Sequence, residues 1–247
     1  MVPGLVSITF RHLPPLEILK LCTTAGLQAV EWGGDVHVPA GNLYRAKEIA
    51  HLSEDYGIII SSYGSYFHLG QSNDIFYRNL ETALELGAPI LRFWAGSKST
   101  KDYTVTERAQ LVSQLRRICE EAEKSRIVLA PEFHINTLTD SIVSLSDLLV
   151  ELPKLRFYWQ PRWDWPEDER LKSLKLQGER NICIHVFSWK IQNGREIRLP
   201  LTAGKKMWEK VFSEKKTGYA LLEFVQNDDP EAFYRDAETL LSWLTYS

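Results

Sequence analysis

The chain has 247 residues, 44% of them hydrophobic and 25% charged, which is the composition of an ordinary soluble globular protein. Its 29 Lys and Arg residues against 32 Asp and Glu residues give a net charge of −3, which argues against a nucleic-acid-binding surface. No apolar run approaches the roughly 20 residues of a membrane-spanning helix, and residues 1–10 lack the basic start and cleavage site of a signal peptide, so we expect a cytoplasmic protein.

Short apolar segments rich in β-branched residues alternate with longer segments of helical periodicity along the whole chain. The predicted strands cover residues 5–10, 27–32, 58–63, 90–94, 127–133, 155–160, 182–187 and 219–225. Helices with clear end signals are predicted at 15–25 and 73–86, each followed by glycine, at 106–124, and at 230–244, which begins with proline.

The strands recur about every 31 residues, the length of a strand, a crossover helix and two loops. Eight such units in a chain of this length predict a (β/α)8 TIM barrel, formed by a single domain over residues 1–247. An open doubly wound sheet usually carries a glycine-rich turn after its first strand, where this chain reads TFRHLPP. Since neither GxGxxG nor a P-loop motif occurs, dinucleotide and P-loop chemistry are not predicted.

Polar residues end several predicted strands, and in a barrel such side chains converge over one mouth. Four of them come from successive strands: Glu132, Gln160, His185 and Glu223. A carboxylate within a strand costs several kcal/mol unless it is paired, hydrogen-bonded or bound to a metal. The oxygen and imidazole donors of this set suit Mn²⁺, Mg²⁺, Co²⁺ or Zn²⁺.

The longest irregular stretch, residues 188–204, follows the seventh predicted strand. Long loops after barrel strands lie at the face where active sites are built, so we expect this loop to act as a lid or substrate clamp.

Short motifs occur in a characteristic order along nearly the whole chain: VEWGG with His37, SYGSY, RFWAG, PEFH followed by NTLTDS, HVF, RLPL and LLEF. In this order they resemble the xylose isomerase-like TIM-barrel superfamily of sugar isomerases and epimerases. The resemblance implies that Glu132, Gln160, His185 and Glu223 hold a divalent metal and that the two glutamates also act as acid/base catalysts. The chain departs from the family pattern twice, since Gln160 replaces the usual Asp ligand and Trp163 a substrate-orienting His.

With a bound metal, the expected reaction is proton abstraction next to a carbonyl through an enediolate, as in a sugar isomerase or epimerase. The predicted partner is a small carbohydrate or keto-sugar, uncharged or carboxylated, and a homo-oligomer is compatible with the sequence. The predicted substrate-binding residues are His37, Arg92, Trp94, His134, Trp163 and Lys190. Two alternatives stay open: a metal-free, catalytically degenerate barrel that binds a sugar-like ligand, and a keto-sugar or inosose dehydratase.

Overall fold

Eight parallel strands pair side by side around a closed barrel in the order β1-β10-β7-β6-β5-β4-β3-β2. The structure is a computed structural model that describes residues 1–162 and 164–245. The barrel strands are β1 (Val2–Val6), β2 (Ala29–Gly33), β3 (Ile59–His68), β4 (Ile90–Trp94), β5 (Val128–Phe133), β6 (Phe157–Trp159), β7 (Asn181–Val186) and β10 (Tyr219–Leu222). The predicted (β/α)8 barrel is confirmed.

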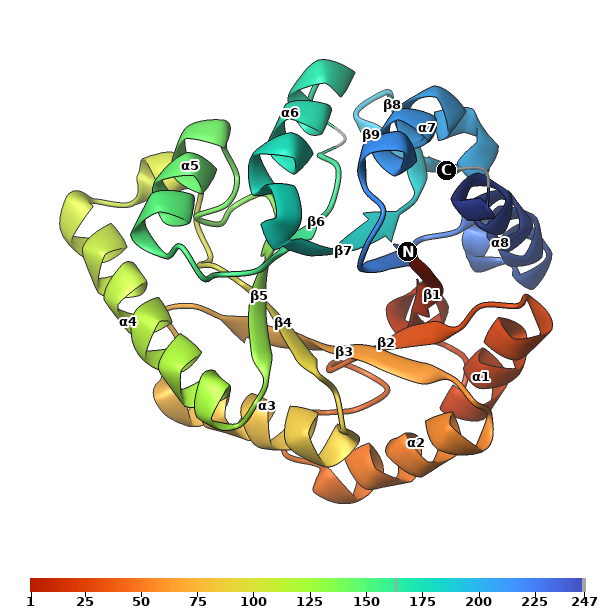
Figure 1. Ribbon diagram of the computed structural model, residues 1–247, viewed down its shortest axis with the longest axis horizontal. Helices are drawn as coiled ribbons and strands as arrows, with labels where there is room; N and C mark the ends of the chain where they lie inside the picture. Colours follow the sequence, from red (N-terminus) through yellow and green to blue (C-terminus); the bar gives the residue numbers. More distant parts are fainter. Residues whose placement is uncertain (163, 246–247) are drawn as a thin grey trace.

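Helices surround the strands, and α8 lies beside α1 where the barrel closes (Figure 1). They are α1 (Pro15–Thr24), α2 (Leu43–Asp55), α3 (Asn73–Leu86), α4 (Val105–Lys124), α5 (Ile142–Glu151), α6 (Glu167–Gln177), α7 (Lys205–Glu214) and α8 (Pro230–Thr245). The end signals act as expected: Gly87 ends α3 in the left-handed region at φ 72°, and Thr104 caps α4 with Glu107. None of the helices in the described residues is long and apolar enough to cross a membrane.

Successive side chains along a barrel strand point in turn toward the surrounding helices and toward the inside of the barrel. Trp32, Phe93 and Phe133 are fully buried hydrophobic side chains, and each directly follows a charged strand residue. Because strand side chains point alternately to opposite faces, residues 31, 92 and 132 point to the other side of the barrel wall. The indole N–H of Trp32 donates a hydrogen bond to the hydroxyl of Ser53 on α2, so this tryptophan lies between the barrel and the helices. Residue 31 therefore points inside the barrel.

Some strand bounds differ from the prediction, since β3 continues to His68 rather than ending at 63 and β10 ends at Leu222 rather than at 225. Two further segments differ in their structure. The first strand spans Val2–Val6 rather than 5–10, because residues 7–10 leave the sheet as a buried 3-10 helix, η1 (Ser7–Phe10). The predicted irregular loop at 188–204 contains an antiparallel hairpin of β8 (Ser188–Gln192) and β9 (Arg195–Leu199), followed by the 3-10 helix η4 (Leu201–Gly204). The hairpin is mostly exposed, so its polar sequence carries no alternation of buried residues that would reveal its strands.

Candidate active site

Five charged side chains meet at the carboxyl ends of the barrel strands, and each is at most 4% exposed: Glu31, Arg92, Glu132, His185 and Glu223. They come from β2, β4, β5 and β7 and from the residue directly after β10. Burying this much charge is tolerated only where the charges pair with one another, since an unpaired buried ion costs several kcal/mol.

Arg92 links two of the carboxylates. Its Nε donates to Oε1 of Glu31 and its Nη1 to Oε2 of Glu132, both at 2.9 Å. Burial opposes ionisation of both glutamates, but the charges of Arg92 and His185 together with hydrogen bonds outweigh it, lowering the pKa of Glu31 to about 2 and that of Glu132 well below its usual range. Gly64 leaves room for this arrangement, because a Cβ there would lie 2.5 Å from Oε1 of Glu31.

His185 lies among three carboxylates. Its Nδ1 is 3.0 Å from Oε1 of Glu132 and 3.5 Å from Oε2 of Glu223, and its Nε2 is 3.6 Å from Oε2 of Glu31. Burial favours the neutral ring, but the surrounding negative charge prevails and raises the pKa of His185 to about 10. The imidazole is therefore positively charged at neutral pH.

The two glutamates expected to act as acid/base pair have different environments. Oε2 of Glu132 accepts hydrogen bonds from Arg92 at 2.9 Å and from the indole of Trp94 at 2.7 Å, and its Oε1 contacts His185. For Glu223 the described residues supply only His185, at 3.5 Å, and the amide of Gln160. Burial and the charge of Glu132 raise the pKa of Glu223 to about 7, against the opposing effect of His185. Glu223 thus exchanges a proton near neutrality, whereas Glu132 stays ionised.

The amide of Gln160 closes the cluster in one of two orientations. With its oxygen inward, that atom lies 3.2 Å from Nδ1 of His185. With its nitrogen inward, the amide donates to Oε1 of Glu132 at 2.7 Å and to Oε2 of Glu223 at 3.0 Å. The second orientation gives both carboxylates an amide donor, whereas the first sets the amide oxygen against two carboxylate oxygens.

The expected metal ligands are thus brought together, but as a hydrogen-bonded cluster. Among the residues that the structure describes, no three His, Cys, Asp or Glu side chains form a group that could hold a metal ion. The physical reason is that Arg92 and protonated His185 already occupy the oxygens of Glu132, and Gln160 contributes no negative charge. As it is arranged, this donor set does not fit a divalent metal.

A cavity of 400 Å³ lies over the cluster and gives a small molecule access to it. Arg92, Glu132, Gln160 and Glu223 line it from within the cluster, and the wall includes Arg11, Tyr66, Trp94, His134, Trp189 and Glu196. Trp189 and Glu196 come from the β8–β9 hairpin, so the segment expected to act as a lid does contact the cavity.

Three of the predicted substrate-binding residues line this cavity: Arg92, Trp94 and His134. His37 is elsewhere, since it is 2% exposed and its ring nitrogens contact Ser7 and the carbonyl of Leu13. Lys190 is exposed on the hairpin and does not line the cavity among the residues described. Trp163 lies outside the described residues.

Arg11 and Tyr66 are cavity residues that the sequence prediction missed. The available signals were the TFRH run after the first strand and the second tyrosine of SYGSY. Tyr66 lies on β3 and its ring meets Trp94 edge-on at 5.1 Å.

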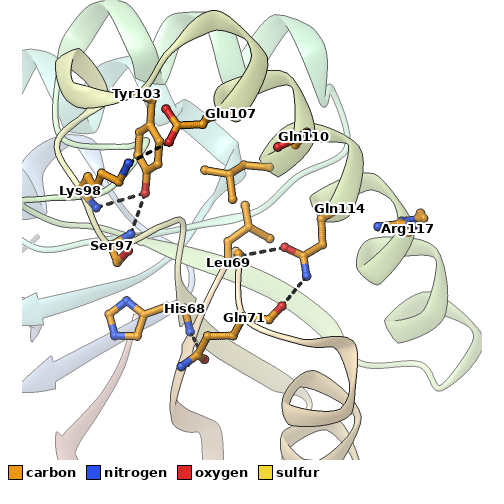
Figure 2. Close-up of a pocket in the computed structure, with 12 residues that line it drawn as sticks. His68, Leu69, Gln71, Ser97, Lys98, Tyr103, Glu107, Gln110, Gln114 and Arg117 are labelled. Atoms are coloured by element: carbon orange, nitrogen blue, oxygen red, sulfur yellow. Dashed lines mark hydrogen bonds and ion pairs between the residues drawn. The ribbon is translucent and has the colours of Figure 1, made fainter.

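A second cavity of 580 Å³ lies beside the first, between the end of β3 and α4 (Figure 2). In Figure 2 the hydroxyl of Tyr103 accepts hydrogen bonds from the backbone of Ser97 and Lys98, and Lys98 pairs with Glu107. His68 lines this cavity and its ring lies 4.8 Å from Trp94, which lines the other one. Of these two cavities, the first is the one that Arg92, Glu132 and Glu223 of the buried charge cluster line among the described residues.

Comparison with known proteins agrees with this architecture. The 3-dehydroshikimate dehydratase of Bacillus anthracis is 28% identical over 164 residues, in a match that covers 60% of this chain and 57% of that protein. The match thus spans little more than half the length of that relative.

Solved structures match the whole barrel. A probable 3-DHS dehydratase from Bacillus anthracis superposes with a TM-score of 0.80 at 20% identity, over 98% of this chain and 99% of that chain. A D-psicose 3-epimerase superposes with a TM-score of 0.71 at 14% identity, over 100% and 99%. At these identities the likeness shows the fold alone. A profile of the xylose isomerase-like TIM barrel family matches residues 19–241, and the chain therefore belongs to this family.

Proposed function

We propose that the chain is a dehydratase that removes a proton next to the carbonyl of a small hydroxylated substrate and eliminates water, with Glu223 as the base. The observation that carries this proposal is the difference between the two glutamates. Glu132 accepts three strong donors and holds no proton, whereas Glu223 is lightly bonded and changes its protonation near neutral pH. The site therefore contains one carboxylate suited to proton transfer.

The presence of one carboxylate suited to proton transfer favours some of the reactions expected from the sequence over others. Epimerisation by a carboxylate on each face of the substrate needs Glu132 to donate a proton, which its pairing with Arg92 opposes. Elimination of water needs only one base and a proton for the leaving hydroxyl. The dehydratase alternative is further supported by the 28% identical relative, which is a 3-dehydroshikimate dehydratase.

The positive charges of the cluster would stabilise the intermediate. Removal of the proton by Glu223 leaves negative charge on the substrate carbonyl oxygen, and preorganised charge in a water-poor site stabilises such an oxyanion. Arg92 lines the cavity, and Nδ1 of His185 lies 3.5 Å from Oε2 of Glu223. Both charges are fixed by their carboxylate partners, so little reorganisation is needed during the reaction.

The divalent metal implied by the family resemblance would require two changes in this site. Gln160 would have to turn its oxygen inward, and His185 would have to release the proton that its carboxylate neighbours stabilise. We therefore propose acid–base chemistry carried by the chain's own residues.

A second candidate is aldose–ketose isomerisation, because one base can return the abstracted proton to the neighbouring carbon. Both reactions are tested by incubating the purified chain, with EDTA present, separately with 3-dehydroshikimate and with D-fructose. Mass spectrometry of the products distinguishes loss of one water from an isomer of unchanged mass. We expect water loss from 3-dehydroshikimate. Isomerised D-fructose without dehydration would favour the second candidate, and binding without turnover of either compound would favour the degenerate, sugar-binding barrel.

A further inference from the structure

Tyr66 supplies a hydroxyl group to the cavity wall nearly opposite the proposed base. It lies on β3, which is separated from β10 by β1 and β2 around the eight-stranded barrel. Tyr66 and Glu223 line the same 400 Å³ cavity. Among the described residues that line this cavity, Tyr66 is the one with a hydroxyl group. Elimination of water needs a proton for the leaving hydroxyl, and Tyr66 presents a hydroxyl group in the same cavity as the base.

Arg11 fixes the phenol and places a positive charge beside its oxygen. The guanidinium Nη2 donates to the hydroxyl of Tyr66 at 2.7 Å. The same guanidinium is held by Oδ2 of Asp35, 2.8 Å from its Nε, and by the carbonyl of Ile8, 3.3 Å from its Nη1. A cation at this distance stabilises the phenolate that forms when a tyrosine gives up its proton.

Several of the other donors that line this cavity are already engaged. The indole of Trp94 donates to Glu132, and the guanidinium of Arg92 bridges Glu31 and Glu132. Nδ1 of His134 is 2.8 Å from the carbonyl of Ile135. Burial, the charge of Asp35 and a hydrogen bond to that carboxylate raise the pKa of the Tyr66 hydroxyl, against the effect of Arg11, so the phenol keeps its proton at neutral pH.

We propose that Tyr66 is the general acid that protonates the leaving hydroxyl of the substrate. This inference rests on the proposed dehydratase function. Glu223 takes the proton from the carbon next to the carbonyl, and the electron pair of the C–H bond gives an enolate with its negative charge on the carbonyl oxygen. When this electron pair returns from the oxygen, the new C=C bond forms to the carbon that carries the leaving hydroxyl. The C–O bond to the leaving hydroxyl breaks, its oxygen takes the proton of Tyr66, and water departs. Tyr66 then regains a proton from solvent and Glu223 returns one, so substrate becomes product plus water.

The experiment compares two leaving groups in the Tyr66→Phe variant, with EDTA present. One substrate is 3-dehydroshikimate, and the other is its analogue in which fluorine replaces the leaving hydroxyl. Fluoride departs without a proton, so loss of a general acid should slow only the first reaction. We expect kcat for the hydroxyl substrate to fall about 100-fold, a typical effect of removing a general acid. We expect kcat for the fluoro analogue to fall less than about threefold.

Tyr63→Phe is the matched control, because Tyr63 also lies on β3 and its hydroxyl donates to the carbonyl of Val38, outside the cavity. Any effect of Tyr63→Phe should be equal for the two substrates. Equal losses for both substrates in Tyr66→Phe would show a structural role and overturn the general-acid assignment, while the proposed function would stand. If the wild-type chain eliminates from neither substrate, the proposed function fails and the assignment fails with it.

Discussion

Glu132 and Glu223 lie on the same side of one imidazole, 3.0 and 3.5 Å from Nδ1 of His185, yet they ionise in different pH ranges. The difference comes from Arg92 and Trp94, which donate to Glu132 and not to Glu223. Two glutamates that are equivalent in the sequence pattern thus have separate roles, one as a permanent anion within the cluster and one as a group able to exchange a proton.

The first prediction concerns the pH dependence of activity. Glu223 acts as a base only when ionised, and its pKa is raised to about 7. We therefore expect kcat/KM for 3-dehydroshikimate to fall about tenfold per pH unit below about pH 7, since kcat/KM reports ionisation of the free enzyme. A profile that stays flat from about pH 5 to pH 8 would contradict the assignment of Glu223 as the base.

The second prediction concerns Arg92 and stability. Arg92→Met leaves Glu31 and Glu132 buried without their cation, which should lower the free energy of unfolding by about 3–5 kcal/mol. Arg45→Met removes a partly exposed ion pair with Glu48 on α2 and should cost less than about 1 kcal/mol. Urea unfolding at neutral pH measures both variants. Equal costs would show that the Arg92 pairs contribute no more than a surface pair.

The third prediction concerns His185 and the pH dependence of stability. Its pKa rises from an ordinary 6.5 to about 10 on folding, so its contribution is complete below about pH 6.5 and is lost as pH rises through about 10. The destabilisation caused by His185→Gln should therefore shrink between pH 6 and pH 10. Urea unfolding across this range is the measurement, with the exposed His51→Gln as control. A pH-independent difference would mean that His185 is not charged in the folded state.

The fourth prediction concerns metal affinity. Gln160→Asp adds a negative charge and removes the amide that bridges Glu132 and Glu223. We expect this variant to bind Mn²⁺ at least about tenfold more tightly than the wild-type chain, by titration calorimetry, because a carboxylate is a stronger ligand than an amide for such hard cations. Gln110→Asp, at an exposed position on α4, is the control. Tight binding of one Mn²⁺ by the wild-type chain would contradict our description of the site.

Local features of the sequence predict both the barrel and the convergence of four side chains, Glu132, Gln160, His185 and Glu223. Strand periodicity and the position of each residue near a strand end place these side chains at one mouth. Charged residues within two strands that end at one barrel mouth favour a buried ion pair of Glu31 with Arg92, and the structure confirms this pair across 61 positions of the chain. The space that Gly64 leaves for it is visible only in the folded chain.

The other site residues that the sequence prediction misplaced or left out have a similar cause, because their contacts join distant parts of the chain. His37 follows a strand as a ligand would, but its contacts with Ser7 and Leu13 place it in the wall outside the cavity. Tyr66 and Arg11 meet across 55 positions, so their pairing is visible only in the folded chain. The direction of proton transfer also required the fold, because it depends on which carboxylate Arg92 and Trp94 reach.

The measurement that tests the central claim most directly is the rate of water loss from 3-dehydroshikimate by the wild-type chain and by Glu223→Gln. Glu231→Gln, at an exposed position on α8, serves as the control. Our account predicts dehydration by the wild-type chain and by the control, and a rate at least about 100-fold lower for Glu223→Gln, since removal of a general base has effects of this size. Dehydration at an undiminished rate by Glu223→Gln, or no dehydration by the wild-type chain, would contradict it.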